Sequence, residues 1–425
     1  MLDYVIDAAR EGTGSRPIVV VSPATVDATR AAFGDTVGWA TQDEPRGTGD
    51  ALLAALSAME GQPAEIVVLS GDTPLLTART VAAVLEQRRL DGAAIALATI
   101  RPDEPVGYGR IVRDGNHVAR IVEEKDATRA ERRITEVNGG LYAFDATWLR
   151  KRIADVPASP VTGEFYLTEL VAMARADGRA VLPVAVEDDM ELAGINDRVQ
   201  LATVEADLRW QILERHLLAG VTMEDPATVF VDSTVELATD VVIEPNVMLR
   251  GTTRIGAGTR IGAGSQLIDA VVGEGCIIRA SVLEACEVED EVTIGPFAHL
   301  RAGASIGRGA QLGNFAEVKK SRLGPGTKQH HFSYIGDAEV GAGVNIGAGT
   351  VTANFDGRRK HRTVIGDGAF IGSDSMLVAP LTVAAGAATA AGSVVTRDVP
   401  PGKIAVGMPA RMRERRSQPD DAPAG

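Results

Sequence analysis

A six-residue rhythm of hydrophobic positions runs through the second half of the chain. Large aliphatic residues recur at every sixth position in three stretches, and glycine often follows them directly. This period is typical of a parallel β-helix, in which short strands wind around a prism, and it does not fit the 3.6-residue period of an α-helix. The aliphatic positions are Val231, Leu237, Ile243, Leu249, Ile255, Ile261, Ile294, Leu300, Ile306, Leu312, Val318, Ile365, Ile371, Leu377 and Val383.

The rhythm breaks twice, at 319–334 and at 352–363. Insertions into a solenoid become surface loops and often lie on a binding face. We therefore expect both stretches to leave the column as loops. The first stretch contains His330 and His331, two of only six histidines in the chain.

Short β-rich runs alternate with helical patterns in the first half. The runs "PIVVVSP", "AEIVVLSGD" and "AAIALATI" predict strands, and the segments 25–33 and 80–89 predict helices. This alternation predicts a mostly parallel sheet with helices on both faces. Ligands of such sheets bind beyond the carboxyl ends of the strands, and Asp72 follows one of these ends.

One long helix is expected between the two halves. Leu201, Val204, Leu208 and Ile212 form an apolar stripe at helical spacing, and no proline interrupts it. We therefore divide the chain into an α/β domain, a linker helix, a β-helix domain and a flexible, polar tail. Their predicted ranges are 1–198, 199–220, 221–410 and 411–425.

Composition narrows the classes of function. The chain has 425 residues, of which 45% are hydrophobic and 24% charged, as in ordinary soluble proteins. A net charge of -14 argues against broad binding to nucleic acids or anionic membranes. No apolar run approaches the roughly 18 residues of a membrane span, and two cysteines are too few for a disulfide framework. We expect a cytoplasmic protein without a nucleic-acid or membrane partner.

Several motifs of the first half occur in a specific order ahead of the hexapeptide repeat. They are "RGTGDA", "LSGDTPL", "GYGRI", "VEEKDA", "EVNGG" and "GINDR". Over nearly the whole chain, this order resembles the bacterial family of bifunctional N-acetylglucosamine-1-phosphate uridylyltransferases / glucosamine-1-phosphate N-acetyltransferases. The resemblance implies an α/β domain of the Rossmann-like, nucleotide-diphospho-sugar transferase type. It also implies that the second domain is a left-handed parallel β-helix.

The resemblance implies two reactions in the synthesis of UDP-N-acetylglucosamine, a precursor of peptidoglycan. The first transfers an acetyl group from acetyl-CoA to glucosamine 1-phosphate. The second transfers a uridylyl group from UTP to the N-acetylglucosamine 1-phosphate so formed, with release of pyrophosphate. The family also implies a homotrimer whose acetyltransferase sites lie between subunits.

The start of the chain departs from the family pattern. Front halves of the family begin with a strand and a turn of the form L-A-A-G-x-G-T-R-M, followed by a lysine, whose backbone N–H groups hold the triphosphate. This chain begins at "MLDYVID", so we expect an N-terminally truncated α/β domain that lacks roughly thirty residues, about the size of a βαβ unit. A start assigned at an internal methionine and a true loss of the first strand both stay open. A true loss would remove the main support for uridylyl transfer.

The resemblance places a sugar-nucleotide site in the α/β domain. Asp72 and Asn196 match a pair that holds Mg²⁺, an ion that prefers oxygen ligands. Taken alone, an aspartate after a strand more often caps a turn, and a lone "GTG" is a weak signal; only the ordered set favours this site. The positions that match contacts to UDP-N-acetylglucosamine are Gln42, Gly47, Thr48, Gly109, Glu123, Asn138 and Asn196.

The resemblance also identifies a base for acetyl transfer. The family motif G-H-x-[TS]-Y reads H-H-F-S-Y here, so His331 takes the catalytic position and His330 replaces a glycine without explanation. With an ordinary pKa of about 6.5, histidine suits the removal of an amine proton near neutral pH. Glu317 matches a carboxylate that orients this base.

A phosphate clamp for glucosamine 1-phosphate matches Arg301, Lys319 and Lys360. Arg301 and Lys319 are three hexads apart, which is one turn of a three-sided helix, so we expect them on adjacent rungs. Phe355 replaces a family tyrosine. Further substrate contacts match Tyr334, Asn345 and Asn354, and contacts to acetyl-CoA match Ala348, Ser373, Ala391 and Arg411.

Other interpretations remain. Adjacent histidines without context usually pack or face solvent, and a zinc site would need about three histidines in register, which the remaining four do not supply. The chain could instead be another sugar-1-phosphate nucleotidyltransferase whose β-helix regulates or oligomerises it. A trimeric scaffold with an inactive front half is a third, non-enzymatic hypothesis.

Overall fold

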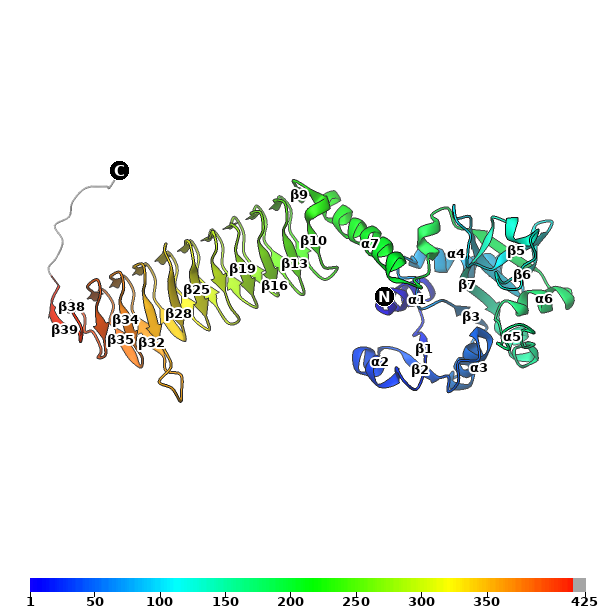
Figure 1. Ribbon diagram of the computed structural model, residues 1–425, viewed down its shortest axis with the longest axis horizontal. Helices are drawn as coiled ribbons and strands as arrows, with labels where there is room; N and C mark the ends of the chain where they lie inside the picture. Colours follow the sequence, from blue (N-terminus) through cyan, green and yellow to red (C-terminus); the bar gives the residue numbers. More distant parts are fainter. Residues whose placement is uncertain (416–425) are drawn as a thin grey trace. The chain divides into compact units, whose positions relative to one another are not determined.

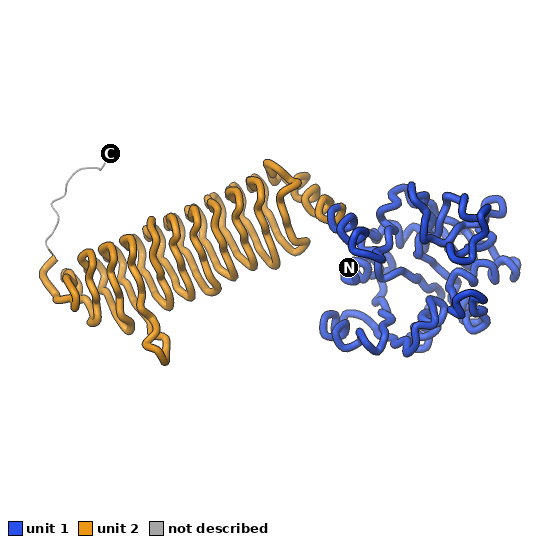
Figure 2. Tube along the Cα trace, in the orientation of Figure 1, with its two compact units in different colours: residues 1–206 blue, residues 207–425 orange. Residues whose placement is uncertain are grey.

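The computed structural model describes residues 1–415 of the chain. It divides into two compact units that meet between residues 206 and 207, inside helix α7 (Arg198–Leu218) (Figures 1 and 2). This helix occupies the place of the predicted linker. The buried face of this helix differs in part from the predicted apolar stripe, because Leu201 is exposed whereas Val204 and Leu213 are buried.

The second unit is a three-sided parallel β-helix whose rungs each place one short strand on each side (Figure 1). The ten-stranded side contains β10 (Phe230–Val231), β13 (Met248–Arg250), β16 (Gln266–Ile268), β19 (Val282–Glu284), β22 (His299–Leu300), β25 (Ala316–Lys319), β28 (Ser333–Gly336), β31 (Val351–Ala353), β34 (Met376–Val378) and β37 (Val394–Val395). The nine-stranded side contains β11 (Glu236–Leu237), β14 (Arg254–Ile255), β17 (Val271–Val272), β20 (Glu287–Val288), β23 (Ser305–Ile306), β26 (Arg322–Leu323), β29 (Ala338–Val340), β32 (Thr363–Ile365) and β35 (Leu381–Val383).

The twelve-stranded side completes the prism. It contains β9 (Thr222–Met223), β12 (Val242–Ile243), β15 (Arg260–Ile261), β18 (Ile277–Ile278), β21 (Thr293–Ile294), β24 (Gln311–Leu312), β27 (Lys328–Gln329), β30 (Asn345–Ile346), β33 (Phe370–Ile371), β36 (Ala388–Thr389), β38 (Lys403–Val406) and β39 (Arg411–Glu414). Only its last pair, β38 with β39, is antiparallel.

The hexad positions form the core of this unit. All the aliphatic residues of the six-residue rhythm are buried except Leu237, which is partly buried. Removing each such side chain from water contributes roughly 1.5–3 kcal/mol. The six-residue spacing also loses its phase between Ile261 and Ile294, because the rungs there are shorter. Leu249 pairs with Leu267 across three full hexads, whereas Leu267 pairs with Leu283 across a shorter rung. The repeat in the sequence is thus confirmed as a β-helix.

The stretch 319–334 is not a loop, contrary to the sequence prediction. It contains β26 and β27, and Leu323 and Thr327 are fully buried in the column. Val318 pairs with Ile335, so this rung falls just short of three full hexads. Gln329 occupies an inward position and donates from Nε2 to Ser333 Oγ at 2.9 Å. A shortened rung with an inward amide looks like an interruption in a hydrophobic pattern, although the backbone continues the column.

The second break in the repeat, predicted at 352–363, is a loop as expected. Residues 354–362 leave the column between β31 and β32 and form the projecting loop of the second unit in Figure 2.

The C-terminal end also differs from its prediction. A flexible tail is expected from residue 411, but Arg411–Glu414 forms β39, with Arg411 opposite Val406 and Glu414 opposite Lys403. The pairing satisfies backbone groups that a free tail would expose to water. Residues 416–425 of the predicted tail lie outside the described residues.

The first unit contains a six-stranded sheet of order β6-β5-β7-β4-β8, in which β3 pairs with the second half of β7, on the same side as β5. Its strands are β3 (Glu65–Val68), β4 (Ile95–Ile100), β5 (Arg110–Asp114), β6 (His117–Val122), β7 (Val137–Asp145) and β8 (Val181–Ala185). The predicted mostly parallel sheet is wrong, because only β4 and β8 pair in parallel. β3 and β4 do run in the same direction, but β7 lies between them, antiparallel to both.

Two further strands, β1 (Ile18–Val21) and β2 (Gly38–Thr41), form a separate parallel pair. The helices of the unit are α1 (Leu2–Thr13), α2 (Val26–Phe33), α3 (Thr48–Ala58), α4 (Ala78–Asp91), α5 (Ala146–Arg152) and α6 (Glu169–Ala176). Short 3₁₀ turns are η1 (Gly34–Thr36), η2 (Glu131–Arg133), η3 (Ile153–Asp155), η4 (Asp189–Leu192) and, at the start of the β-helix, η5 (Pro226–Thr228).

Helices cover both faces of the six-stranded sheet, as predicted. All six residues of β4 are buried. Ile95 and Leu97 pack in the cluster that includes Leu149 and Leu170 of α5 and α6, while the alternating alanines and Ile100 pack against α4. The two-residue alternation of a strand therefore divides β4 between two cores.

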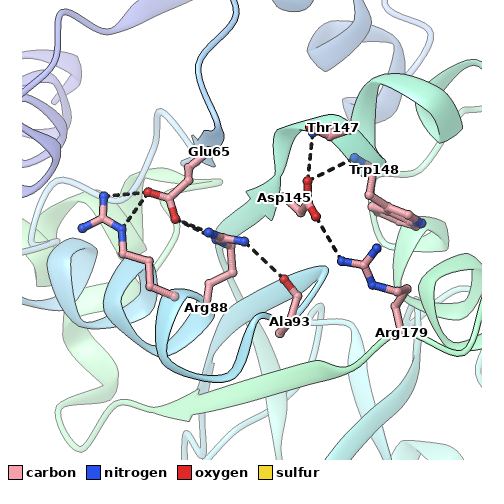
Figure 3. Close-up of polar contacts among 8 residues, drawn as sticks. Glu65, Arg88, Ala93, Asp145, Thr147, Trp148 and Arg179 are labelled. Atoms are coloured by element: carbon pink, nitrogen blue, oxygen red, sulfur yellow. Dashed lines mark hydrogen bonds and ion pairs between the residues drawn. The ribbon is translucent and has the colours of Figure 1, made fainter.

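Ion pairs and hydrogen bonds join helices α4 and α5 to the ends of strands β3 and β7 (Figure 3). The Glu65 carboxylate of β3 accepts from Arg88 Nε at 2.9 Å and from Arg89 Nε at 2.7 Å on α4. Burial acts to raise the pKa of Glu65, but the hydrogen bonds and charges of Arg89 and Arg88 outweigh it and hold this pKa below its ordinary value. Asp145 caps α5 by accepting from the backbone N of Thr147 at 2.9 Å.

Candidate active sites

Three cations of the predicted phosphate clamp meet on the ten-stranded side of the β-helix. Leu300 pairs with Val318, so Arg301 and Lys319 lie on adjacent rungs, as their spacing predicts. Lys360 comes from the projecting loop, and the positive charges of Lys360 and Arg301 lower the pKa of Lys319. Among the described residues, neither lysine forms an ion pair. Two ammonium groups without a carboxylate form a site suited to an anion.

Glu317 contacts the clamp and not the predicted base. Its Oε1 accepts from Arg301 Nη1 at 2.9 Å. No hydrogen bond joins it to His331 among the described residues. Glu317 lies opposite His299 and Tyr334 on the outer face of the ten-stranded side, whereas His331 lies at a corner of the prism. Its position in the register therefore makes Arg301 the partner of Glu317.

Tyr334 lies close against its own strand. A Cβ placed on Gly336 would be 2.6 Å from Tyr334 Cζ, so the phenol extends over this glycine. Gly336 pairs with Lys319, and the charge of Tyr334 is among the influences that raise the pKa of Arg301, after the hydrogen bond to Glu317. The tyrosine thus lies beside the three cations, and only a glycine at 336 leaves room for it.

His331 belongs to a row of predicted site residues that are stacked along one corner of the prism. The backbone N of Gly349 donates to Phe332 O at 2.7 Å, and the same corner continues through hydrogen bonds from Asp374 to Ala348 and from Gly392 to Ser373. These contacts place four predicted residues at equivalent positions of successive rungs: His331, Ala348, Ser373 and Ala391. The structure thus brings the predicted base and the predicted acetyl-CoA contacts together.

His330, unexplained by the sequence, has a partner. Its Nε2 lies 2.9 Å from Gln311 Oε1 on the preceding rung. Its ring is nearly perpendicular to that of His331, with the ring centres 6.5 Å apart. The adjacent rungs have Gly313 and Gly347 at this corner position. His330 is therefore anchored on the twelve-stranded side, and the ring of His331 makes no hydrogen bond among the described residues.

The remaining predicted residues of this unit lie near the same rungs. Asn354 is nearly buried and donates from Nδ2 to Asp337 Oδ2, so its amide secures the base of the projecting loop. Asn345 lies opposite Lys328 on the twelve-stranded side. Arg411 follows Ala410, whose backbone N donates to Val394 O at 2.9 Å, so it lies at the C-terminal end of the column.

A cavity of about 250 Å³ opens beside the base of the projecting loop. Sequence reasoning missed most of its lining, because the side chains come from two rungs and the loop. The residues are Lys320, Asp337, Lys360, His361 and Arg362. The Arg362 guanidinium is paired with Glu339, and Asp337 already accepts from Asn354.

In the first unit, Gln42, Gly47 and Thr48 line a cavity of about 300 Å³. Pro45, Ala51, Glu164 and Tyr166 complete the lining. Sequence reasoning missed Glu164 and Tyr166, which lie far along the chain in "GEFYLTEL". Gly47 has φ of 106°, and a Cβ there would be 2.6 Å from Phe165 O. The glycine is thus required by the approach of the chain at Phe165, a reason that the motif alone does not reveal.

Glu123 lies in a mostly buried position next to Gly109. It accepts from Thr168 Oγ1 at 2.9 Å, and a Cβ on Gly109 would be 3.5 Å from its Oε2. Burial raises the pKa of Glu123, against the hydrogen bond from Thr168. The backbone N of Asn138 donates to Gly109 O at 2.9 Å. The three predicted sugar contacts therefore form one group, and Thr168 is a further member of it that sequence reasoning missed.

Asp72 and Asn196 are brought together after the parallel strands β3 and β8. A Cβ on Gly194 would lie 3.3 Å from Asp72 Oδ2 and 3.9 Å from Asn196 Nδ2, so the glycine leaves a space between the two side chains. A carboxylate and an amide beside such a space fit a Mg²⁺ ion that keeps waters and phosphate oxygens as its other ligands, once the Asn196 amide turns its oxygen in place of Nδ2 toward the ion. Burial raises the pKa of Tyr108, which lies near Gly194 and Asp72.

Two kinds of feature are absent from the described residues, 1–415. No group of three or more His, Cys, Asp or Glu side chains in this part of the chain is arranged to hold a metal ion. No helix in it is both long enough and apolar enough to cross a membrane.

Known proteins resemble this chain over both of its units. A family described as "MobA-like NTP transferase domain" matches residues 1–138. The chain is thus a transferase that joins a nucleotidyltransferase domain to a left-handed parallel β-helix. The "Bifunctional protein GlmU" of Trichlorobacter lovleyi is 43% identical over 410 residues, which cover 96% of this chain and 89% of the relative. The chain therefore belongs to the GlmU family, and the resemblance noted from its motifs is confirmed.

Other relatives give the same result. Proteins of the same name from Anaeromyxobacter sp. (strain K) and from Mycobacterium bovis (strain BCG / Pasteur 1173P2) are 50% and 42% identical. The match to the Anaeromyxobacter protein covers 89% of this chain and 78% of that relative. The match to the Mycobacterium protein covers 96% of this chain and 84% of that relative. Family members are transferases with acetyltransferase and uridylyltransferase activities in UDP-N-acetylglucosamine synthesis.

One solved structure has only a distant likeness to the chain. It is titled "Activity and Crystal Structure of Arabidopsis UDP-N-acetylglucosamine acyltransferase". It is 16% identical and covers 46% of this chain and 72% of its own, with a TM-score of 0.33, which is too low to bear on the fold.

Proposed function

We propose that the β-helix unit transfers the acetyl group of acetyl-CoA to the amine of glucosamine 1-phosphate. The observation that carries this proposal is the meeting of Arg301, Lys319 and Lys360, which come from two rungs and a loop. A phosphate monoester would offset the mutual repulsion of the two lysines. Tyr334 and Asn345 would complete the sugar site.

In this proposal, His331 is the general base. It accepts a proton from the amine as the C–N bond forms, and the C–S bond then breaks to release coenzyme A. The thioester would lie along the corner next to Ala348, Ser373 and Ala391, which share this edge of the prism with His331. Arg411, at the end of the column, would contact the coenzyme phosphates.

The α/β unit would then transfer a uridylyl group from UTP to N-acetylglucosamine 1-phosphate and release pyrophosphate. Gln42, Gly47 and Thr48 would contact the uracil. Gly109, Glu123 and Asn138 would hold the sugar, and Asp72 and Asn196 would hold Mg²⁺. The bound ion supplies positive charge where negative charge builds on the phosphate oxygens.

We further propose a cytoplasmic homotrimer that supplies a precursor of peptidoglycan. Exposed phenylalanines support self-association of the β-helix: Phe297, Phe315 and Phe332 occupy one corner of consecutive rungs, and their exposed fractions are 57%, 62% and 57%. The rings of Phe297 and Phe315 stack with their centres 5.5 Å apart. An apolar strip of this kind on a protein surface often marks an interface.

The first test measures free thiol released by the purified chain with acetyl-CoA and glucosamine 1-phosphate. We expect thiol release, and a decrease in rate of about 10²–10⁴-fold in His331→Ala, the range for general-base catalysis. His330→Ala is the matched control, since it removes the neighbouring imidazole on the same corner, and it should stay close to the unchanged protein.

Two outcomes would contradict the acetyltransferase proposal. Without thiol release, nucleotide chemistry alone would favour the other hypothesis, a sugar-1-phosphate nucleotidyltransferase with a regulatory β-helix. A large loss in His330→Ala with an active His331→Ala would transfer the role of base to His330.

A further inference from the structure

The projecting loop at residues 354–362 has its own internal anchor. Phe355 and Lys360 form an antiparallel bridge, and the backbone N of His361 donates to Asn354 O at 2.7 Å. The loop is therefore a small hairpin on the side of the column, visible as the projection in Figure 2. Lys360 lies on its returning arm, next to the exposed side chain of Phe355.

One carboxylate holds the tip of this hairpin. Asp356 Oδ1 accepts from the backbone N of Arg358 and of Arg359, each at 2.7 Å. Its Oδ2 lies 2.7 Å from His361 Nε2. The hydrogen bond from Arg359, followed by those from His361 and Arg358, lowers the pKa of Asp356 to about 2, so the carboxylate is charged at any pH where the enzyme would work. The residues on both sides of Lys360 are thus bonded to Asp356.

The base of the hairpin is held separately. Asn354 donates to Asp337, and Arg362 pairs with Glu339. These contacts join the two ends of the loop to the column, so beyond its own backbone pairing the tip is held by the side chain of Asp356. The ammonium group of Lys360 lies near that of Lys319, which Arg301 also approaches, so like charges repel one another here in the absence of an anion.

We propose that Asp356 is a positioning residue that holds Lys360 in place for the phosphate of the sugar substrate. Without it, the tip would lose three hydrogen bonds while the repulsion from Lys319 and Arg301 remained. The binding of the phosphate would then have to order the loop as well, and this cost in conformational entropy lowers affinity. The inference rests on the proposed acetyltransferase function and adds to it a residue that never touches the substrate.

The test separates the Michaelis constant for glucosamine 1-phosphate from the other kinetic constants. In Asp356→Ala we expect this constant to rise about 10-fold, since a displaced binding group costs one to two orders of magnitude. The kcat and the Michaelis constant for acetyl-CoA should change little. Asp356→Asn keeps an oxygen for the two backbone N–H groups, so its Michaelis constant for glucosamine 1-phosphate should lie between those of the unchanged protein and Asp356→Ala. Arg358→Ala is the matched control, because Asp356 contacts only its backbone.

A double-mutant cycle with Lys360→Ala distinguishes positioning from general damage. If Asp356 acts through Lys360, Asp356→Ala should have no further effect on the Michaelis constant in the Lys360→Ala background. Equal effects in both backgrounds, or an unchanged constant in Asp356→Ala, would overturn the inference while thiol release by the unchanged protein still supported the proposed function. No thiol release by the unchanged protein would instead reject the proposed function itself.

Discussion

The two units of this chain assemble their sites by different rules. In the β-helix, the neighbours of a side chain are set by the register of the rungs, and Arg301 lies beside Lys319 because the rung between them spans three full hexads. In the α/β unit, Asp72 and Asn196 meet because two strands far apart in the sequence end at the same edge. A repeat therefore allows contacts to be read directly from spacing, whereas a mixed sheet requires the order of its strands to be known.

The chemistry of the two regions differs as well. The β-helix site is a set of cations at the surface, and the charges of Lys360 and Arg301 lower the pKa of the half-buried Lys319. The predicted sugar contacts of the α/β unit instead include a mostly buried carboxyl group, that of Glu123, and this burial raises its pKa. The first region should therefore respond most to changes in shape and charge at the surface, and the second to pH.

Among the changes that test this comparison, the largest expected effect comes from filling the space over Gly336. In Gly336→Ala, the new methyl group would collide with the ring of Tyr334 and displace it from the cations. A displacement of about 1 Å at an active site can cost 10²-fold in rate, so we expect a loss of that order in thiol release. Gly309→Ala is a control for backbone strain in the β-helix, since its φ of 65° disfavours alanine although no atom lies within 4 Å of the new methyl group. A Gly336→Ala variant as active as the control would show that the position of Tyr334 does not matter.

The smallest expected effect concerns stability in the α/β unit. Because the pKa of Glu123 is raised on folding, protonation favours the folded state. This stabilisation is complete below the unfolded pKa of about 4.3 and is lost as the pH rises through the folded pKa. Glu123→Gln cannot ionise, so its melting temperature should exceed that of the unchanged protein by a few degrees at pH 8, and the difference should close near pH 4.

Glu131 provides a control of opposite sign. Hydrogen bonds from Thr128, followed by Arg120, lower its pKa to about 2, so its contribution is present above the unfolded pKa and is lost as the pH falls through the folded value. Glu131→Gln should thus lower the melting temperature at pH 8. If the two variants had the same pH profile, the difference in environment would not control stability.

The sequence predicted the β-helix more fully than the α/β unit for a physical reason. One inward aliphatic position per strand recurs throughout the column, so the core residues and the adjacency of Arg301 and Lys319 follow from the period. The period failed where a rung is shorter than three hexads and contains an inward Gln329, because a buried amide looks like a surface residue in a hydrophobic pattern.

In the α/β unit, no local pattern reveals that β7 lies between β3 and β4. The predicted parallel sheet was therefore wrong, although the helices on both faces were correct. The motifs placed Asp72, Asn196, Gly109 and Glu123 in groups, but Thr168, Glu164 and Tyr166 join them only through the fold.

Glu317 gives the most direct test of the claim that register sets the roles in the β-helix site. The family motif predicts a carboxylate that orients His331, whereas the rungs place Glu317 against Arg301 at 2.9 Å. In Glu317→Gln, we expect the Michaelis constant for glucosamine 1-phosphate to rise about 10-fold, because Arg301 loses a charged partner that fixes it. The kcat should stay close to that of the unchanged protein. A large decrease in kcat with an unchanged Michaelis constant would mean that Glu317 serves the base, and it would contradict the account.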